Sequence, residues 1–455
     1  MNGTTAIGQE PRVIDVVDVV EGQVLGWFVV RLVLVSWLVT FFDGFDMNVI
    51  AFAAPYLTSD FALDKLMLTS VFTSGIIGTL LGSILFGMLG DRLGRRRSII
   101  LATAAFGLLT LVFAAAGSYH QLVLLRFLDG TALGGVLPLT WALSVEYVPR
   151  RYRATIVTLI MMGYGIGVSA AGPISVALIP RFGWRSVFIF GGVASLLAAV
   201  LLYRALPESL RFLATRSGTR ERLERIVRRL APGRTDIEGA TFVLSGQDGK
   251  ARRKHSPAVL FQGPLRWITP LIWLAYASSS INTFFFTTWG PTLFEEMGLS
   301  RSTAAWCASL NSVAGAVGAL VLMRFTDRIG PISIAWLPAV AVPFLVFIGF
   351  VPVSTATFIA MMALLYVFLG GSHYGIISIA GNFYPTVHRG LGTGWVSGAG
   401  KLGSIAGPWA GGLIMASSLA PQRTFAVAAI CPAVFLVCML AIGLMVRGGW
   451  AAQAE

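Results

Sequence analysis

Residues 41–46 read Phe-Phe-Asp-Gly-Phe-Asp and lie inside a long apolar segment that runs from about residue 27 to residue 57. At the pitch of an α-helix, side chains three residues apart share a face, so Asp43 and Asp46 are predicted to point the same way. An ionised carboxylate near the centre of a bilayer costs about 2.5–3.5 kcal/mol. That cost is tolerable where the group faces a watery cavity, is protonated or meets a cation, and each of these implies a function. The structural alternative is that one aspartate caps a helix break at Gly44.

The rest of the chain is as apolar as this segment, which argues against a soluble protein. Of its 455 residues, 56% are hydrophobic and 12% are charged, whereas a typical soluble domain carries about 25% charged residues. Continuous runs of about 20 apolar residues recur, which is the length of helix that crosses a hydrocarbon core. Transmembrane barrels show only a weak alternation over roughly 10 residues. The sequence therefore predicts an all-α membrane protein.

Twelve such runs can be placed, in two sets of six on either side of a hydrophilic segment. They cover residues 27–57, 67–90, 97–117, 121–146, 154–180, 184–206, 267–293, 302–325, 332–352, 354–383, 390–418 and 422–447. The predicted organisation is an N-terminal tail, a six-helix bundle, a central loop, a second six-helix bundle and a C-terminal tail. Their limits are residues 1–26, 27–206, 207–266, 267–447 and 448–455.

The formal net charge of +13 comes largely from the links between the predicted spans. Links after even-numbered spans hold clusters of arginine, whereas links after odd-numbered spans hold single charges. By the positive-inside rule, the even links, both termini and the central loop are predicted to be cytoplasmic. Basic residues that set topology do not indicate a nucleic-acid partner. Within the central loop, the arginine-rich stretch 220–229 predicts a short amphipathic helix on the membrane surface.

Short matches at a spacing of 236 or 235 residues (327 − 91, 389 − 153 and 407 − 172) relate the two sets of spans. They pair residues 91–94 (Asp-Arg-Leu-Gly) with 327–330 (Asp-Arg-Ile-Gly), Arg153 with Arg389, and Gly172-Pro173 with Gly407-Pro408. Two halves with the same chain direction are one known transporter plan, in which the site lies between the halves near the midplane. The predicted fold is therefore twelve transmembrane helices in two pseudo-symmetric six-helix bundles.

No enzyme or metal constellation competes with this interpretation. The four histidines and three cysteines lack the spacing of metal ligands, and there is no phosphate-binding glycine loop of the nucleoside-triphosphatase kind. We therefore predict no metal, no cofactor and no ATP-driven step.

The most specific string in the chain is Gly-Met-Leu-Gly-Asp-Arg-Leu-Gly-Arg-Arg-Arg at residues 87–97. Gly87 is expected to allow close helix contact, as small residues do in membranes. A tight turn with basic anchors is the structural alternative. The string resembles the signature loop between spans 2 and 3 of the major facilitator superfamily, which latches the two halves in the outward-open state. The resemblance implies gate and latch roles for Gly87, Asp91, Arg92, Gly94 and Arg95.

The second half carries a partial copy of this loop at Asp327 and Arg328. The copy continues into Pro331, where the family often has a basic residue. A latch role for Asp327 and Arg328 is therefore implied less strongly than for the first loop.

Two further segments extend the resemblance. Residues 146–153 resemble the family's motif after span 4, and residues 206–213 resemble its Pro-Glu-Ser ending of span 6. The resemblance implies that Glu146, Arg150 and Arg153 belong to a cytoplasmic charge network that breaks and reforms as the halves rock. The alternative is that Glu146 and Arg153 form a surface salt bridge worth ~0–1 kcal/mol.

The resemblance narrows to one branch of that superfamily, the aromatic acid:proton symporters of the 4-hydroxybenzoate and protocatechuate type. It is carried by residues 43–46 with Ala54-Pro55, by 289–292 (Trp-Gly-Pro-Thr), and by 384–386 (Tyr-Pro-Thr) with Arg389. Members of that branch carry benzoate-like or hydroxybenzoate-like acids inward with protons. The resemblance implies a transporter rather than an enzyme, in a bacterial-type inner membrane, and we expect a monomer.

A carboxylate substrate needs a cation, and two basic residues besides the border residue Arg31 lie deep in predicted spans. Lys401 lies mid-span in Gly-Ala-Gly-Lys-Leu-Gly (398–403), where the glycines leave room for a ligand beside its stem. It is too central to reach an interface by snorkelling. The branch usually has arginine there, and lysine lacks the bidentate fork, so a shifted substrate preference is implied. Arg126 has Asp129 three residues on, so substrate binding and local neutralisation are both open.

Aromatic and imidazole side chains complete the candidate substrate site. His373 falls where the branch often has glutamine, and its imidazole could bind a ring hydroxyl, relay a proton or serve only as a hydrogen-bonded structural residue. Phe285 and Trp289 belong to an aromatic run at 284–289 and could face an aromatic ring. Most of such a run must face lipid or neighbouring helices.

The inferred mechanism has a proton neutralise Asp43 or Asp46 and an aromatic carboxylate bind beside Lys401 before the halves rock inward. One alternative keeps the fold but changes the cargo to another organic acid, a sugar or an expelled drug. An alternative from another class is a non-transporting membrane sensor or scaffold whose central basic loop holds a partner.

Overall fold

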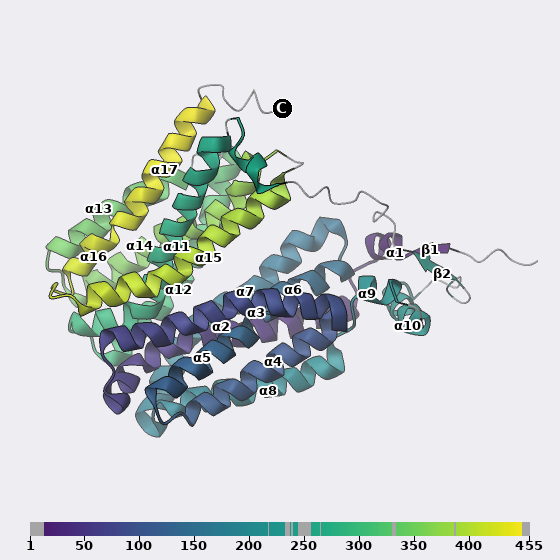
Figure 1. The fold of residues 1–455 in the computed structure, drawn as a ribbon, viewed down its shortest axis with the longest axis horizontal. Helices are drawn as coiled ribbons and strands as arrows, with labels where there is room; N and C mark the ends of the chain where they lie inside the picture. The colour runs from purple at the N-terminus through teal and green to yellow at the C-terminus, as the bar shows by residue number, and fades with distance from the viewer. Residues whose placement is uncertain are drawn as a thin grey trace, which may run out of the picture.

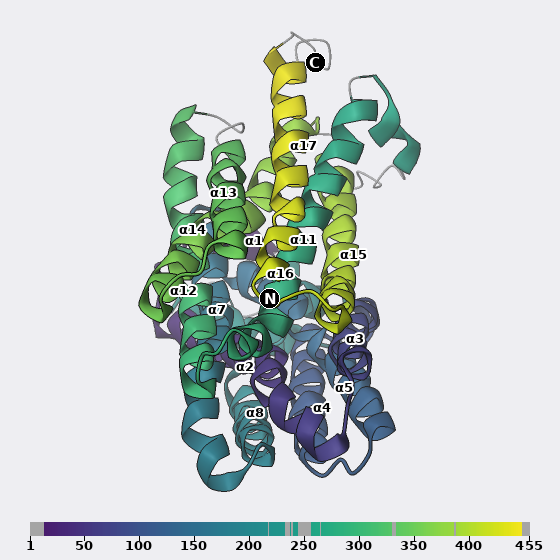
Figure 2. The same ribbon diagram turned by 90° about the vertical axis from the view of Figure 1, so that its left-hand side faces the viewer.

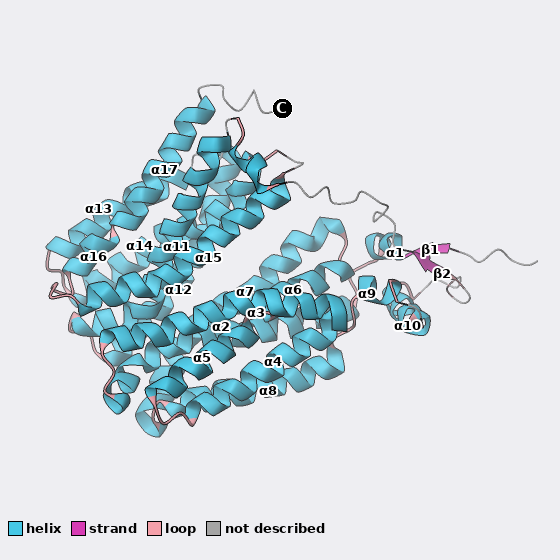
Figure 3. Cartoon of the chain, viewed as in Figure 1, coloured by secondary structure: helices cyan, strands magenta, loops and turns pink. Residues whose placement is uncertain are grey.

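The computed structural model is almost entirely helical (Figure 3). It describes residues 13–216, 218–232, 237, 240–243, 256–263, 265–329, 334–385 and 388–447, with the backbone alone at 322–329, 377–382 and 446–447. The only sheet within these residues is a two-stranded parallel pair, β1 (Val13–Asp15) with β2 (Thr241–Val243).

The first bundle contains seven helices and a 3₁₀ turn. They are α2 (Trp27–Phe61), α3 (Lys65–Leu93), α4 (Arg95–Ala114), α5 (Tyr119–Leu133), α6 (Val136–Ser144), η1 (Val145–Tyr147), α7 (Arg150–Phe182) and α8 (Arg185–Ala205). The second bundle contains α11 (Leu265–Glu296), α12 (Arg301–Ile329), α13 (Trp336–Phe350), α14 (Thr355–Phe383), α15 (Arg389–Ala416), α16 (Arg423–Ala428) and α17 (Ile430–Arg447). The connecting elements are α1 (Val16–Gly22), α9 (Leu210–Ala214), α10 (Arg220–Leu230) and η2 (Pro257–Phe261).

Each of the twelve predicted spans is occupied by helix, which confirms the predicted fold class. The fourth span is made of α5 and α6, and the twelfth of α16 and α17. Within the described residues, nine spans are long and apolar enough to cross a membrane on length and composition alone. The three that fall short of those criteria are α11, α13 and α15, of which α13 is a shorter apolar helix.

Helix α2 is continuous through Gly44, so the predicted alternative of a helix break at that glycine is wrong. Gly44 instead allows α7 to approach, because a Cβ there would lie 2.2 Å from the carbonyl oxygen of Tyr164. The close approach of α7 at Gly44 leaves Asp43 and Asp46 packed against helices of their own bundle. Both carboxylates are buried, at 3% and 2% exposure.

The two bundles share a core at one end only. In Figures 1 and 2, α2–α8 and α11–α17 form separate groups. A shared core contains Phe52 and Phe72 from the first bundle and Trp289 and Phe294 from the second. A second core draws only on residues 14–240, and a third only on 260–442. The bundles therefore meet at the end where α3 begins and α11 ends, and have separate cores at the other end.

That other end, here called the basic end, is marked by Arg92, Arg95 and Arg150. It also carries α1, α9 and α10, which lie together beside the β1–β2 pair (Figure 1). The apolar face of α10 is buried there, with Leu223 and Val227 in the same core as α1. The short helix predicted at residues 220–229 is therefore present as α10, and protein covers its apolar face.

Candidate functional site

A buried charge network lies within the first bundle. One terminal nitrogen of Arg126 donates to Asp46 Oδ2 and to Asp129 Oδ2, each at 2.7 Å. Thr110 donates to Asp46 Oδ1 at 2.9 Å and lies 3.3 Å from Asp129 Oδ1. The other terminal nitrogen of Arg126 donates to the carbonyl oxygens of Asp46 and Met47, at 3.0 and 3.3 Å. The guanidinium is thus fully engaged by its own bundle.

This network separates two residues that the sequence treated as a pair. Asp46 is held by Arg126 and Thr110, whereas Asp43 Oδ2 is buried without a hydrogen-bond partner among the described residues. An unpaired buried carboxylate is costly, so the state of Asp43 depends on groups that approach it from elsewhere. Two roles were left open for Arg126, substrate binding and local neutralisation, and its geometry fits local neutralisation. Its positive charge is shared between Asp46 and Asp129.

The charge that approaches Asp43 comes from the second bundle. Lys401 of α15 lies within electrostatic range of Asp43 of α2 without forming an ion pair with it, and the Lys401 side chain is exposed. Both residues lie mid-helix, so the two charges face the space between the bundles at the centre of the molecule. The predicted site residues Asp43 and Lys401 are therefore brought together, as the sequence proposed for a carboxylate and its cation.

Tyrosines that the sequence reasoning missed surround this pair. Tyr164 of α7 interacts electrostatically with Asp43 and with Tyr374 of α14. Tyr276 of α11 is 9% exposed, whereas Tyr374 is 47% exposed. Tyr164 and Tyr276 lie outside every motif considered, whereas Tyr374 directly follows the candidate residue His373.

His373 joins the same cluster. Its ring lies 5.5 Å from that of Tyr276, and its Nδ1 lies 3.3 Å from the hydroxyl of Ser279. The imidazole is 8% exposed, so it lies behind the tyrosines rather than in open space. This geometry gives His373 a hydrogen-bonding role beside the central space.

The glycines around Lys401 do not all leave room for a ligand, as the sequence suggested. A Cβ at Gly400 would lie 2.1 Å from the ring of Tyr276, and one at Gly403 would lie 2.3 Å from the carbonyl oxygen of Ala277. These two glycines let α11 pack closely against α15. Only Gly398 has open space, since a Cβ there would meet nothing within 4 Å.

Phe285 and Trp289 lie away from this central cluster. They are 3% and 0% exposed in the core shared by both bundles. Trp289 Nε1 donates to the carbonyl oxygen of Pro408 at 3.0 Å, and its ring meets Phe72 edge-on at 5.5 Å. These two side chains pack the closed end of the interface, so the structure does not bring them to Lys401.

Phe284, not Phe285, lines an inter-bundle cavity. The cavity measures about 40 Å³ and is also lined by Asn48, Arg126 and Tyr164. Asn48 Oδ1 is buried and lacks a hydrogen-bond partner among the described residues. A water occupies about 30 Å³ of liquid, so this cavity has room for a water but not for an aromatic ring.

The end opposite the basic end is closed by contacts between the bundles. Lys65 of α3 forms an ion pair with Glu296 of α11. The guanidinium of Arg301 stacks on Tyr56 of α2 at 4.6 Å and lies 3.4 Å from Glu295. Partial burial raises the pKa of the Glu295 carboxyl above its usual value, and the charge of Arg301 opposes that shift. None of these residues was predicted from the sequence to form a gate.

At the basic end, the signature loop makes contacts within its own bundle. Gly94 has φ +94°, and a Cβ there would lie 2.6 Å from a carboxylate oxygen of Glu208. Glu208 accepts from the backbone nitrogens of Arg96 and Ser209 at 3.0 and 2.9 Å. Gly94 therefore has a structural requirement, because only glycine fits both the backbone and the carboxylate.

The role expected of Gly87 is not seen, since a Cβ there would meet nothing within 4 Å. Close helix contact is made instead at Gly90, where a Cβ would lie 2.6 Å from Leu139. Asp91 and Arg92 are exposed, and the carbonyl oxygen of Arg92 accepts from Arg216 at 2.6 Å.

The predicted charge network is partly rearranged. Glu146 pairs with Arg95, whereas Arg153 lies 3.6 Å from Glu21 and does not pair with Glu146. Arg150 also approaches Glu21, at 3.5 Å. The sequence missed Glu21 because it lies in the tail before the first span. Asp327 and Arg328 lie in the last turn of α12, where the side chains are outside the described residues.

Comparison with protein families identifies this architecture. The model of the Major Facilitator Superfamily matches residues 36–245 and 272–449. The chain is 32% identical over 403 residues to the 4-hydroxybenzoate transporter PcaK of Pseudomonas aeruginosa, which covers 88% of this chain and 90% of that protein. It is 32% identical to a gallate transporter of Pseudomonas putida, over 89% of this chain and 90% of that protein.

Solved structures agree on the fold. The xylose transporter XylE from Escherichia coli, in a partially occluded inward open conformation, matches with a TM-score of 0.68 over 91% of this chain and 98% of that chain, at 16% identity. A bacterial homologue of the human lysosomal transporter Spinster, described as inward-facing and unoccupied, matches with a TM-score of 0.67 over 95% and 98%, also at 16% identity.

Proposed function

This chain belongs to the major facilitator superfamily, and from that membership we propose that it imports small aromatic carboxylates together with protons by alternating access. The relatives support the cargo class, since those at 32% identity are named as 4-hydroxybenzoate and gallate transporters. The observation that carries the proposal is a buried oxygen of Asp43 in one bundle, unpartnered among the described residues, with the exposed cation Lys401 of the other bundle within electrostatic range.

Asp43 is the proposed proton carrier, and Asp46 the proposed structural partner of Arg126. Asp46 already accepts from a guanidinium and a hydroxyl, at 2.7 and 2.9 Å. Asp43 has an unpaired carboxylate oxygen and a single cation nearby, Lys401. When the carboxylate of a substrate binds Lys401, the substrate and Asp43 share one positive charge. One negative charge is then uncompensated, and protonation of Asp43 removes it. Substrate binding and protonation therefore favour one another.

The proposed substrate-binding site lies beside Lys401, between the closed end and the basic end. Tyr164 and Tyr374 offer aromatic faces for the ring of the substrate. Tyr276 and His373 contact one another and supply polar groups behind these two tyrosines. The cavity beside Phe284 is too small for a ring, at about 40 Å³, which is consistent with a site closed on that side.

The arrangement of cores supports an inward-facing state. The bundles share a core and the Lys65–Glu296 ion pair at one end, and have separate cores at the basic end. The protein is a multi-pass membrane protein. We place the basic end and both termini in the cytoplasm of a bacterial-type inner membrane because positive residues face inward, and we propose that it acts as a monomer.

Uptake of labelled 4-hydroxybenzoate into energised vesicles tests this function, with and without a collapsed pH gradient. The proposal predicts accumulation that is lost when the gradient collapses. Counterflow with a panel of aromatic acids, aliphatic acids, sugars and neutral compounds then identifies the cargo. Exchange of a sugar or a neutral drug in place of aromatic acids would replace the proposed cargo, and the absence of any exchange would favour a sensor or scaffold.

A further inference from the structure

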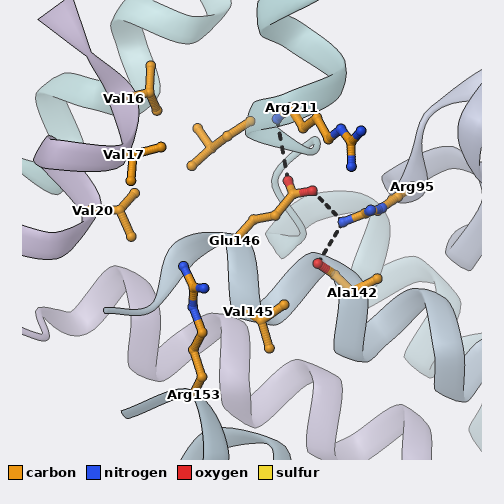
Figure 4. Close-up of a pocket in the computed structure, with 10 residues that line it drawn as sticks. Val16, Val17, Val20, Arg95, Ala142, Val145, Glu146, Arg153 and Arg211 are labelled. Carbon is orange, nitrogen blue, oxygen red and sulfur yellow. Dashed lines mark hydrogen bonds and ion pairs between the residues drawn. The ribbon is translucent and has the colours of Figure 1, made fainter. Parts of the chain in front are cut away.

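A second cavity lies at the basic end, away from the central site, beside the charge network of Glu146. It measures about 330 Å³ and opens between α1, the η1 turn and α9 (Figure 4). Small-molecule sites begin at about 300 Å³, so this volume fits a small organic molecule. Val16, Val17 and Val20 of α1 form one wall, and three arginines lie on the other sides.

The charges around this cavity do not cancel. Both oxygens of Glu146 are engaged: one pairs with Arg95, and the other accepts from Ser209 Oγ at 2.7 Å and lies 3.5 Å from the backbone nitrogen of Arg211. Figure 4 shows the contacts of Glu146 with Arg95 and Arg211, with Arg153 extending toward the valine wall. The guanidinium of Arg211 has no ion-pair partner in the described part of the chain. The lining of the cavity therefore carries an excess of positive charge beside apolar side chains.

Arg153 adds to this excess because a nearby carboxylate compensates its positive charge only weakly. Its Nε donates to the carbonyl oxygen of Val148 at 3.2 Å, and its Nη2 lies 3.6 Å from Glu21, which does not line the cavity. One carboxylate thus approaches both Arg153 and Arg150. Guanidinium groups bind carboxylates and phosphates through a planar fork, and Arg153 and Arg211 both retain donors for such a ligand.

The wall that α1 contributes is fixed in place rather than loosely attached. Asp15 caps the helix by accepting from the backbone nitrogen of Val17 at 2.9 Å. The strand before it pairs with β2. At its other end, Gln23 donates to the carbonyl oxygen of Tyr147 at 2.8 Å. The cavity is therefore a built feature, held by the first bundle and by the central loop together.

We propose that this cavity is a second anion-binding site, which takes a small amphiphile with a carboxylate or phosphate group on a short apolar body. The anionic group binds Arg153 and Arg211, and the apolar body lies against the valines of α1. A bound ligand joins α1, α9 and the start of α7, and so stabilises the basic end of the first bundle by mass action. The source of the anion is a free organic acid or a lipid headgroup, which share this chemistry.

Ligand-induced thermal shifts of the purified full-length protein in phosphatidylcholine nanodiscs test the proposal, with hexanoate as the probe and hexanol as its neutral counterpart. Hexanoate is expected to raise the Tm of the wild type, and hexanol is not. In Arg211→Gln and in Val17→Trp, which fills the cavity, the half-saturating hexanoate concentration should rise at least tenfold. Arg222→Gln removes the same charge from the exposed face of α10 and should respond like the wild type.

Two further arms separate the possible sources and sites. If a lipid headgroup is the natural occupant, nanodiscs that contain phosphatidylglycerol should abolish the hexanoate shift in the wild type, and mass spectrometry should find that lipid retained by Arg222→Gln but not by Arg211→Gln. Lys401→Gln should keep the hexanoate response, which separates this site from the central one. An equal response in Arg211→Gln, Val17→Trp and the wild type, an equal shift from hexanol, or a response lost only in Lys401→Gln would overturn the proposal.

Discussion

The guanidinium of Arg126 and the carboxylate of Asp46 form a buried ion pair at 2.7 Å, with 3% and 2% of their side chains exposed. The same nitrogen also binds Asp129 at 2.7 Å. One cation therefore serves two carboxylates within the first bundle. Asp43 is left outside this network, and the charge that reaches it belongs to Lys401 of the other bundle.

The two aspartates should differ sharply when each is replaced by asparagine. Asp43→Asn mimics a permanently protonated carboxyl group, so we expect it to keep counterflow exchange but lose accumulation driven by a pH gradient. Asp46→Asn removes one partner of a buried ion pair, which costs about 3–5 kcal/mol of stability. Transport assays and thermal unfolding of the purified variants measure the two effects.

Asp91→Asn is the matched control for stability, because Asp91 is exposed and surface substitutions usually change stability by about 0.5 kcal/mol or less. Gradient-driven accumulation by Asp43→Asn at the wild-type level would show that another group carries the proton. An Asp46→Asn protein as stable as Asp91→Asn would remove the structural role of the ion pair.

Lys401 should determine affinity for the carboxylate of the substrate. Lys401→Met is expected to raise the KM for 4-hydroxybenzoate at least tenfold, because charge-assisted hydrogen bonds contribute about 1.5–3 kcal/mol. Lys401→Arg should keep transport and change the order of preference among ring-substituted acids, since its fork binds carboxylates differently. Initial rates over a concentration series give these values, and an unchanged KM in Lys401→Met would exclude the contact.

The ion pair between Lys65 and Glu296 should stabilise the closed end of the interface. Its side chains are 32% and 34% exposed, so we expect a contribution of ~1 kcal/mol at most, or about fivefold in the equilibrium between states. Glu296→Gln should shift spin-label distances across this end toward the open state. The swapped pair Lys65→Glu with Glu296→Lys should restore the wild-type distances, and failure of the swap would mean that the pair does not hold the gate.

Gly94 and Gly87 provide a matched test of the signature loop. Gly94→Ala places a Cβ at φ +94° and 2.6 Å from Glu208, and such backbone strain costs about 1–3 kcal/mol. Gly87→Ala meets open space and should be tolerated. The Tm values of the two purified variants decide the comparison, and equal losses would contradict the assigned role of Gly94.

The sequence predicted the fold well because apolar run length and the placement of arginines are local signals. Helices occupy all twelve predicted spans, although the lengths of α2 and α7 exceed the predicted ones. The cover of the apolar face of α10 could not be predicted, because periodicity shows that a face is apolar but not whether lipid or protein covers it. Its cover comes from α1, some 200 residues earlier in the sequence.

The site was less predictable because it depends on which helices meet. Asp43 and Lys401 were found from their cost in an apolar span, and Arg126 from the same reasoning. The ion pair of Arg126 with Asp46 joins α5 to α2 and leaves no mark in sequence spacing. Tyr164 lies outside any motif. Phe285 and Trp289 were placed in the site although helical rotation turns them into the closed core.

Substrate-dependent proton uptake measures the central claim most directly. In weakly buffered proteoliposomes, a pulse of 4-hydroxybenzoate should make the outer solution more alkaline with the wild-type protein, as each substrate enters with a proton. The change should be absent from empty liposomes and from Asp43→Asn, which should still exchange labelled substrate. Uptake by the wild type without a pH change, or an equal pH change with Asp43→Asn, would contradict the assignment of Asp43 as the proton carrier beside Lys401.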